Sequence, residues 1–373
     1  MENTKNTKKK GVMHMPGRIG YLRFADETIG DIFEGNTVEF TKKPSDTQKA
    51  ILGDASRLSK ERFRDFLSDR IFSRYRRDVE KLLFRLGLSE YDEFAIAWKT
   101  NALNTKDSFW ICSDPSEKYG DKTNFLFKEV FKMSLDAEGG SAHSPDGMNV
   151  KNYGIYNGKF GIYKKRLSEV VMDVESEVAC FEFAKVFGVP CCPAYRTGQN
   201  VVFSEFCYDF NREYLVHARR FFAGIARSGD LYADFCGIFP EFAGEFARMC
   251  VFDFLMYQDD RHLSNFAIKI DERNRRHFYE LYDNGRSLFY ESGEQTVSNA
   301  CGNIEMYAPP FGEIGSYYDV VCKIKEEYDI SSLVNLNVSK DQIFGILKSA
   351  GFVGYRLEGG VNWIANCIDV LKS

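Results

Sequence analysis

The segment QDDRHLSNFAIKIDERNRRHFYELYDNG, residues 258–285, concentrates side chains that could do chemistry. Asp260 stands five positions before Asn265, and Asp283 stands near the far end of the same segment. A positioned aspartate can accept a proton from a hydroxyl group. An amide oxygen beside a carboxylate makes a pair of hard oxygen ligands, suited to Mg²⁺ that also holds a phosphate. These residue types therefore indicate a magnesium-dependent reaction of a phosphate group.

The stretch between Asn265 and Asp283 has the pattern of a β-hairpin. NFAIKI and RHFYELY alternate as strands do, and DERN supplies the turn between them. Counting outward from the turn places Asn265 opposite residues 281–283, and paired strands lie about 5 Å apart. We therefore expect Asn265 and Asp283 to converge. Asp260 precedes Asn265 at the interval that kinases use between a catalytic base and a metal ligand, whereas Asp259 is one residue out of step.

Phosphoryl transfer also needs a cation for the phosphates, held by a carboxylate on a neighbouring helix. The strand-like run GKFGIYKKRL offers Lys164, which shares a strand face with apolar neighbours and is therefore preferred over Lys165. On the helix that follows, Glu175 and Glu177 compete for the pairing position, and Glu182 lies too far along.

The wider pattern gives an α+β order, in which a strand-rich piece, one helix and two strands precede a helical lobe. Strands are expected between Gly17 and Thr41 and in NFLFKEVFKM, NYGIYNGKFGIYKKRL, AYRTG and VVFSEF. Helix is expected from Ser59 to Gly87 and over YDEFAIAWKT, with another running from Ser168 as N-cap to Gly188 as stop. Further helices are expected near residues 211–225, 241–257, 340–350 and 361–371.

Five short motifs, in order along residues 140–290, resemble those of HipA-like serine/threonine kinases. SPDGMNVK resembles the phosphate loop Ser-x-x-Gly-x-Gln-x-Lys, with Asn149 where glutamine is usual. The helix SEVACFEFAKVFGVP resembles the pattern Glu-x-x-x-x-x-x-Ala-Lys-x-x-Gly, which places the pairing glutamate at Glu177. The stretch SEF resembles the hinge strand that receives adenine. DRHLSNF and LYDNG resemble the catalytic loop and the metal-binding segment.

The resemblance implies a two-lobed protein-kinase-like fold and transfer of the ATP γ-phosphate to a protein hydroxyl. It assigns catalysis to Asp260, Lys164 and Glu177, and Mg²⁺ binding to Asn265 and Asp283. It assigns ATP binding to the phosphate loop and the hinge: Ser144, Gly147, Asn149, Lys151, Glu205, Phe206 and Cys207. In the family the phosphate-loop serine can itself be phosphorylated, which makes Ser144 an expected autophosphorylation site, with Ser141 as the neighbour to exclude.

The domain organisation expected from these patterns has four parts. Residues 1–15 form a disordered tail, residues 16–120 a mixed accessory region, residues 121–207 the strand-rich N-lobe and residues 208–373 the helical C-lobe. A net charge of −5 argues against binding to nucleic acid or to an anionic membrane surface. Ten scattered cysteines without a CxxC pair, and the absence of a secretory signal or a long apolar run, favour the cytoplasm.

Three other functions fit parts of the same pattern. A metal-dependent phosphohydrolase could use Asp259, Asp260, His262 and Asp283, but it gives Lys164 no task. A kinase of a small molecule or a lipid would have the same site with another acceptor. A non-catalytic pseudokinase is disfavoured because all three polar catalytic positions are present. The expected partners are an unidentified protein substrate and an antitoxin-like protein.

Overall fold

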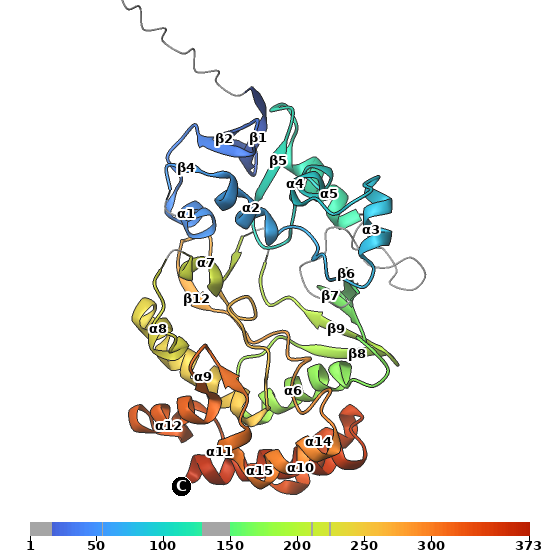
Figure 1. The fold of residues 1–373 in the computed structure, drawn as a ribbon, viewed down its shortest axis with the longest axis vertical. Helices are drawn as coiled ribbons and strands as arrows, with labels where there is room; N and C mark the ends of the chain where they lie inside the picture. The colour runs from blue at the N-terminus through green and yellow to red at the C-terminus, as the bar shows by residue number, and fades with distance from the viewer. Residues whose placement is uncertain (1–16, 54, 129–149, 210–211, 224) are drawn as a thin grey trace, which may run out of the picture.

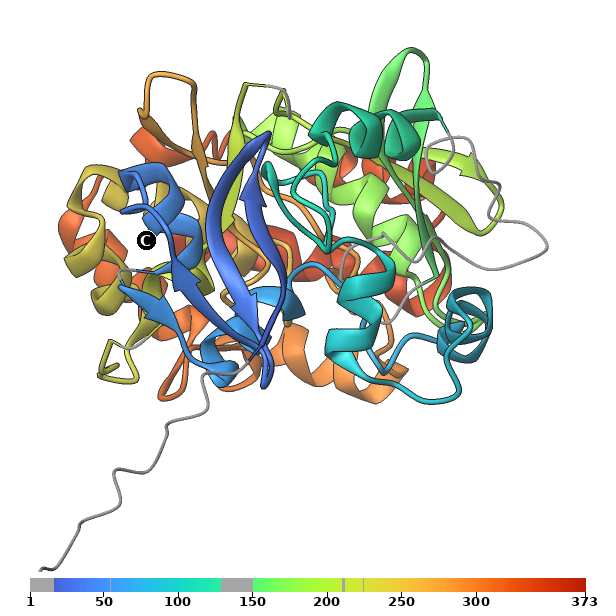
Figure 2. The same ribbon diagram turned by 90° about the horizontal axis from the view of Figure 1, so that it is seen from above.

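The structure is a computed structural model that describes residues 17–53, 55–128, 150–209, 212–223 and 225–373. It has the α+β, two-lobed protein-kinase-like fold, preceded by a mixed region of strands and helices. Figure 1 shows this accessory region at one end of the molecule and the C-terminal helices at the other. Figure 2, which looks down on the accessory region, shows this region in front of the rest of the molecule.

The accessory region is built on a five-stranded sheet in the order β4-β3-β2-β1-β5. Its strands are β1 (Arg18–Phe24), β2 (Glu27–Phe33), β3 (Thr37–Phe40), β4 (Arg57–Leu58) and β5 (Phe109–Cys112). The strands expected between Gly17 and Thr41 are therefore confirmed. The helices are α1 (Asp46–Leu52), α2 (Lys60–Ser68), α3 (Val79–Leu86), α4 (Glu93–Lys99) and α5 (Tyr119–Lys128).

Two expectations for this region were wrong. The helix expected from Ser59 to Gly87 is interrupted between α2 and α3, where Arg70 and Arg76 are buried and engage Asp107 and Asp78. Between α2 and α3 the backbone therefore follows these buried ion pairs, and the helical spacing of the apolar residues does not determine its path. The start of NFLFKEVFKM lies in helix α5 and not in a strand, whereas the rest of that run lies outside the described residues.

The N-lobe contains a four-stranded antiparallel sheet in the order β6-β7-β9-β8. Its strands are β6 (Lys151–Tyr156), β7 (Lys159–Lys165), β8 (Ala194–Gly198) and β9 (Val201–Glu205). An Asn-Gly turn joins β6 to β7, with φ of 50° at Asn157 and 76° at Gly158, as a tight hairpin requires. Gly161 is needed for the pairing of β7 with β9, because a Cβ there would lie 2.2 Å from the carbonyl oxygen of Ser204.

Helix α6 (Asp173–Phe187) crosses from β7 to β8 and ends at Gly188, which has φ of 72°. The expected start at Ser168 was wrong, because the N-cap is Met172. Two contacts fix this start. The Met172 N–H donates to the carbonyl of Tyr290 at 2.8 Å, and Asp173 Oδ2 accepts from the Leu167 N–H at 2.8 Å. Tertiary hydrogen bonds therefore set the first turn of the helix that carries Glu177.

The C-lobe combines a small sheet with helices. The sheet has the order β10-β11-β12, formed by β10 (Tyr214–His217), β11 (Ala267–Ile270) and β12 (Arg276–Phe278). The hairpin β11–β12 was expected, but β10 lies where helix was expected, and of the residues described in that stretch only those of α7 (Ala218–Phe222) form a helix. Pairing of Val216 with Ile268 supplies the backbone partners that outweigh the local helical pattern.

The remaining helices surround a single large apolar core. They are α8 (Leu231–Ile238), the 3₁₀ helix η2 (Pro240–Phe242), α9 (Ala243–Leu255), α10 (Glu294–Gly302), α11 (Ile304–Tyr307), α12 (Tyr317–Glu327), α13 (Ile330–Leu333), α14 (Lys340–Ala350) and α15 (Gly354–Lys372). Two short strands, β13 (Pro310–Phe311) and β14 (Gly315–Ser316), pair beside α12. Among the described residues, no helix combines the length and the apolar character that a membrane crossing requires. All ten cysteines are free thiols.

An ion-pair cluster joins the accessory region to the C-lobe. Asp69, directly after α2, contacts Arg219 and lies 2.6 Å from Arg220 Nε of α7. Burial alone would raise the pKa of Asp69, but the charges of Arg220, Lys106 and Arg219 hold it well below its usual value. Arg220 also reaches Asp65 Oδ2 at 2.8 Å, although the Asp65 side chain is 56% exposed. The partly buried Asp69 carboxylate is therefore the main electrostatic link between α2 and α7.

Replacing Asp69 with asparagine should lower the free energy of unfolding at pH 7 by roughly 2 kcal/mol, because two arginines lose a partly buried counter-charge. Asp65→Asn is the matched control, expected to cost less than about 1 kcal/mol because the pair is exposed. The stabilisation by Asp69 is complete above its ordinary pKa of 3.8 and is lost as the pH falls below it. Urea unfolding at several pH values checks this prediction. An equal loss in both variants would contradict it.

Candidate active site

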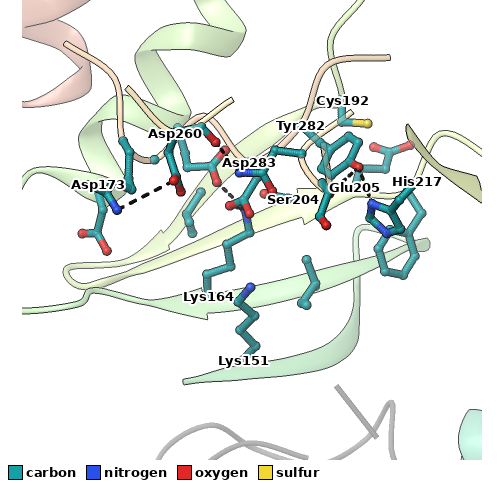
Figure 3. A pocket seen from close by; sticks show the side chains of 18 of the residues that line it. Lys151, Lys164, Asp173, Cys192, Ser204, Glu205, His217, Asp260, Tyr282 and Asp283 are labelled. Carbon is teal, nitrogen blue, oxygen red and sulfur yellow. Dashed lines mark hydrogen bonds and ion pairs between the residues drawn. The ribbon is translucent and has the colours of Figure 1, made fainter. Parts of the chain in front are cut away.

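Lys164 on β7 is buried and lies at the centre of a group of ion pairs. Its Nζ contacts Glu177 Oε1 on α6 and lies 2.9 Å from Asp283 Oδ1 in the segment after the hairpin. Burial alone would lower the pKa of Lys164, but the carboxylates of Asp283 and Glu177 raise it, so the ammonium stays charged. Figure 3 shows the amine directed from the N-lobe sheet toward Asp283. The group thus joins the two lobes.

Asp283 is held as an ionised carboxylate at the base of this group. Burial alone would raise its pKa, but the charges of Lys164 and Lys151 hold the pKa of Asp283 well below its usual value. The backbone of Asp283 is left-handed, with φ of 57°, a conformation that aspartate tolerates better than most residues. Two residues further on, a Cβ at Gly285 would lie 3.5 Å from Glu177 Cγ. The turn that carries Asp283 therefore packs directly against α6.

The loop from Asp260 to Asn265 is braced by its own hydrogen bonds. Asn265 Nδ2 donates to the Asp260 carbonyl at 2.7 Å, which orients the amide so that Oδ1 could hold a cation. His262 accepts from the Ser264 N–H through Nδ1 at 3.1 Å. The Asp260 N–H donates to Gln258 Oε1 at 2.9 Å. These bonds fix the backbone of the loop and leave the Asp260 carboxylate directed into the cavity described below.

Arg261, between Asp260 and His262, ties both segments of the site to α9. Its guanidinium is buried and forms two hydrogen bonds with Asp253 of α9, at 2.8 and 2.9 Å. The same side chain donates to the carbonyls of Asn265 at 2.8 Å and Tyr282 at 2.6 Å, and to Asn284 Oδ1 at 2.6 Å. Arg261 therefore fixes the position of Asn265 relative to the two residues that flank Asp283.

Arg286 lies at the mouth of the site beside two aspartates. Its Nε is 3.2 Å from Asp259 Oδ1 and its Nη1 is 3.8 Å from Asp260 Oδ1. Burial raises the pKa of Asp259 to about 6 and also raises the pKa of Asp260, while Arg286 opposes both shifts. Asp260 lines the cavity, whereas Asp259 turns to Arg286. The two adjacent carboxylates are thus placed differently.

These residues border a cavity of about 560 Å³ between the lobes. Figure 3 shows Lys164, Asp260 and Asp283 at one end and Glu205 and His217 toward the other. The accessory region adds to the wall, and cavity-lining residues from it are Asp69, Thr105 and Lys106. A cavity of this size with apolar walls and a few convergent polar groups suits a nucleotide-sized ligand.

The competing residues from the sequence also have positions in the structure, and Lys165 lines the same cavity as Lys164. Lys165 is exposed at the end of β7, and the described contacts of Glu177 go to Lys164. Glu175 engages Arg166 and Arg196, with the latter pair at 2.9 Å. Lys151 begins β6 directly opposite Lys164 and lines the cavity. Ser144, Gly147 and Asn149, assigned to the phosphate loop, lie outside the described residues.

The predicted hinge is only partly open to a ligand. Glu205 ends β9, and Glu205 and Phe206 line the cavity. The backbone N–H of Cys207 donates to the hydroxyl of Tyr279 at 3.0 Å. One backbone amide of the predicted hinge, that of Cys207, is therefore already engaged.

Several contacts of the site escaped the sequence analysis. Arg261 and Arg286 stand next to predicted residues, but only the fold shows that one is buried and the other faces Asp259. His217 is buried in the cavity wall with Nδ1 3.0 Å from the Tyr282 hydroxyl, and burial lowers its pKa to about 3. Nothing in the local sequence separates these residues from surface ones.

Among the described residues, no three His, Cys, Asp or Glu side chains form a metal cluster.

Two lobes that meet at a hinge, with a Lys–Glu pair in one and a hairpin flanked by Asn265 and Asp283 in the other, are the arrangement of the protein-kinase-like fold. No protein-family model matches the chain, and no curated protein matches its sequence. A search of solved structures finds HipA of Shewanella oneidensis MR-1, from a toxin–antitoxin complex with HipB and operator DNA. That likeness has a TM-score of 0.50 at 12% identity, and it covers 95% of this chain and 99% of HipA.

A second solved structure is CtkA, a proinflammatory kinase of Helicobacter pylori, with 16% identity and a TM-score of 0.48 over 61% of this chain and 88% of CtkA. At these identities only the likeness to HipA informs the argument, and it concerns the fold. The resemblance to HipA-like kinases drawn from the motifs is thus confirmed for the fold, accessory region included.

Proposed function

We propose that this chain is an ATP-dependent protein serine/threonine kinase of the HipA-like type. The observation that carries the proposal is the contact of Lys164 with both Glu177 and Asp283 at one end of an interlobe cavity. A lysine on a sheet, paired with a helix glutamate and facing an aspartate after the hairpin, is the arrangement that positions nucleotide phosphates in kinases. The HipA-like fold supports the same function.

In the proposed mechanism each residue has one task. Lys164, oriented by Glu177, neutralises charge on the α- and β-phosphates. Asn265 Oδ1 and the Asp283 carboxylate would hold Mg²⁺, which when bound supplies charge stabilisation to the phosphate oxygens. Asp260 orients the acceptor hydroxyl and takes its proton. The transition state is loose, so most of the rate gain comes from positioning and charge stabilisation.

A phosphohydrolase is less well supported by the geometry. It would draw on Asp259 and Asp260 together, yet only Asp260 lines the cavity while Asp259 pairs with Arg286. It would also leave the buried pair of Lys164 and Glu177 without a task. The two functions differ in their products, because a kinase forms ADP and a phosphorylated protein whereas a hydrolase releases phosphate from a monoester.

The test is transfer of label from [γ-³²P]ATP to protein in a host lysate, with ADP formation followed in parallel. Glu177→Gln should reduce transfer about 10- to 100-fold, because the ammonium of Lys164 loses the partner that orients it. Glu182→Gln on the same helix is the matched control, since that side chain is exposed and pairs with Lys185. Absence of labelled protein and of ADP with the native enzyme would refute the proposed kinase.

The proposal extends to autophosphorylation at Ser144, which lies outside the described residues. Incubation with Mg-ATP should add one phosphate to the intact chain, and peptide mapping should place it on Ser144 and not on Ser141. Ser144→Ala should abolish the mass increase while transfer to other proteins continues. An active enzyme that gains no phosphate at Ser144 would remove autophosphorylation from the proposal and leave the kinase function intact.

We also propose that an antitoxin-like protein binds this chain, because the HipA structure that shares its fold comes from a complex with HipB. Co-purification from the native host, followed by the lysate assay on the isolated complex, tests this point. A specific partner that lowers transfer would support it. A chain that purifies alone and is fully active would contradict it.

A further inference from the structure

The hinge end of the cavity leaves unexpected groups available to a nucleobase. Both backbone polar groups of Cys207 are engaged from the hairpin side. Its N–H donates to the Tyr279 hydroxyl at 3.0 Å, and its carbonyl accepts from Lys269 Nζ at 3.2 Å. A base that used the Cys207 amide would have to displace the tyrosine hydroxyl.

Tyr279 is firmly placed. It is 3% exposed, and its ring packs edge-on against Tyr208 with centroids 5.8 Å apart and in a tilted arrangement against Tyr282 with centroids 5.7 Å apart. Its hydroxyl also lies 3.3 Å from Cys192 Sγ. Turning the ring away would break these contacts and expose buried apolar area. The Cys207 amide is therefore closed by a side chain that packing holds in position.

The carbonyl of Glu205, two residues earlier, is open for a different reason. The Glu205 N–H donates to the carbonyl of Pro193 at 2.8 Å, where the chain enters β8. In an antiparallel pair of this kind, the N–H of the residue opposite Glu205 would donate to the Glu205 carbonyl. That residue is Pro193, and proline has no N–H. Within the described pairing of β8 with β9, the Glu205 carbonyl therefore has no donor opposite it and can accept a hydrogen bond from a ligand.

Ser204 supplies a second acceptor beside it. The side chain is buried and lines the cavity, and Oγ has no hydrogen-bond partner in the part of the chain that the structure describes. Figure 3 shows Ser204 between Lys164 and the hinge end. Ile162, Val202 and Leu215 provide apolar walls for the same space. A buried hydroxyl without a partner is energetically unfavourable, and a ligand that forms a hydrogen bond with it removes that penalty.

We infer that Ser204 is a specificity-determining residue, and that the base is recognised as a 6-aminopurine by Ser204 Oγ and the Glu205 carbonyl in place of the Cys207 amide. The exocyclic amine of adenine has two hydrogens, one for each acceptor. A purine with an oxo group at that position would present an acceptor to the Glu205 carbonyl and be disfavoured. This inference rests on the proposed kinase function and adds to it how the nucleotide is selected.

The test compares Mg-ATP with the magnesium complex of purine riboside triphosphate, which lacks the exocyclic amine. Isothermal titration of the full chain measures the Kd of both. Ser204→Ala should weaken ATP binding about five- to tenfold, the loss of one hydrogen bond in a buried site, and leave the analogue within about twofold. Ser204→Thr, which keeps the hydroxyl, should bind ATP as the native chain does. Tyr279→Phe should not strengthen ATP binding.

Two outcomes would overturn the inference. One is an equal effect of Ser204→Ala on both nucleotides, or none on either, while the native chain binds ATP. The other is tighter ATP binding by Tyr279→Phe, which would show that the base uses the Cys207 amide once it is released. If the native chain binds neither nucleotide, the proposed kinase function itself fails, and that result is distinct from the other two.

Discussion

Asp260→Asn should lower phosphoryl transfer about 10²- to 10⁴-fold, the range for loss of a positioned general base. The Kd for Mg-ATP should stay within about threefold of the native value, because the Asp260 carboxylate faces the acceptor and is not assigned to the cation. The change preserves the shape of the side chain. It also keeps the backbone bonds that brace the loop, since Asn265 donates to the main-chain carbonyl of residue 260.

Asp283→Asn, in contrast to Asp260→Asn, should mainly weaken the binding of Mg-ATP. Removing this charge deprives Lys164 of an ion-pair partner and the proposed Mg²⁺ of a carboxylate ligand. The Kd for Mg-ATP should therefore rise about 10- to 100-fold. Single-turnover rates and equilibrium titrations of both variants separate binding from chemistry. Asp259→Asn is the matched control, because that carboxylate pairs with Arg286 and does not line the cavity. Full activity in the first two variants would reject the assignment.

Helices and strands whose apolar residues recur at regular intervals along a short stretch were predictable from the sequence. Alternation and the intervening turn fixed the hairpin, and its register pairs Ile268 with Phe278. Continued outward, that register places Asn265 near residues 281–283, and Asp283 and Asn265 do line one cavity. The motifs were informative for the same reason, since each is a short run whose spacing follows from a strand, a helix or a loop.

Features set by distant partners were not predictable. The stretch containing β10 has a helical pattern, but Val216 pairs with a strand more than 50 residues away. The start of α6 is fixed by the carbonyl of Tyr290 and not by Ser168. Arginine is usually exposed, so Arg261 gave no local sign that Asp253 would hold it in the core. Burial and long-range pairing determine such residues, and a single sequence shows neither.

Arg261→Met should be the most destabilising of the substitutions considered. It leaves Asp253 buried without its counter-charge, although Tyr317 still donates to Oδ2 at 3.0 Å. Loss of one partner of a fully buried pair costs about 3–5 kcal/mol. The free energy of unfolding from urea titration should fall by this amount. Arg273→Met is the matched control, because that side chain is exposed on the hairpin turn.

A second variant separates stability from the positioning role of Arg261. The double change Arg261→Met with Asp253→Leu removes both charges and should recover much of the lost stability, because a buried ion pair can be replaced by apolar packing. Transfer should nevertheless stay low and require more Mg²⁺, since the carbonyls of Asn265 and Tyr282 have lost the donor that holds them together. Native transfer and native Mg²⁺ dependence in this stable double variant would show that Arg261 serves only as the partner of Asp253. A raised Mg²⁺ requirement in a stable chain would instead separate positioning from folding, because a purely structural role predicts that activity returns with stability.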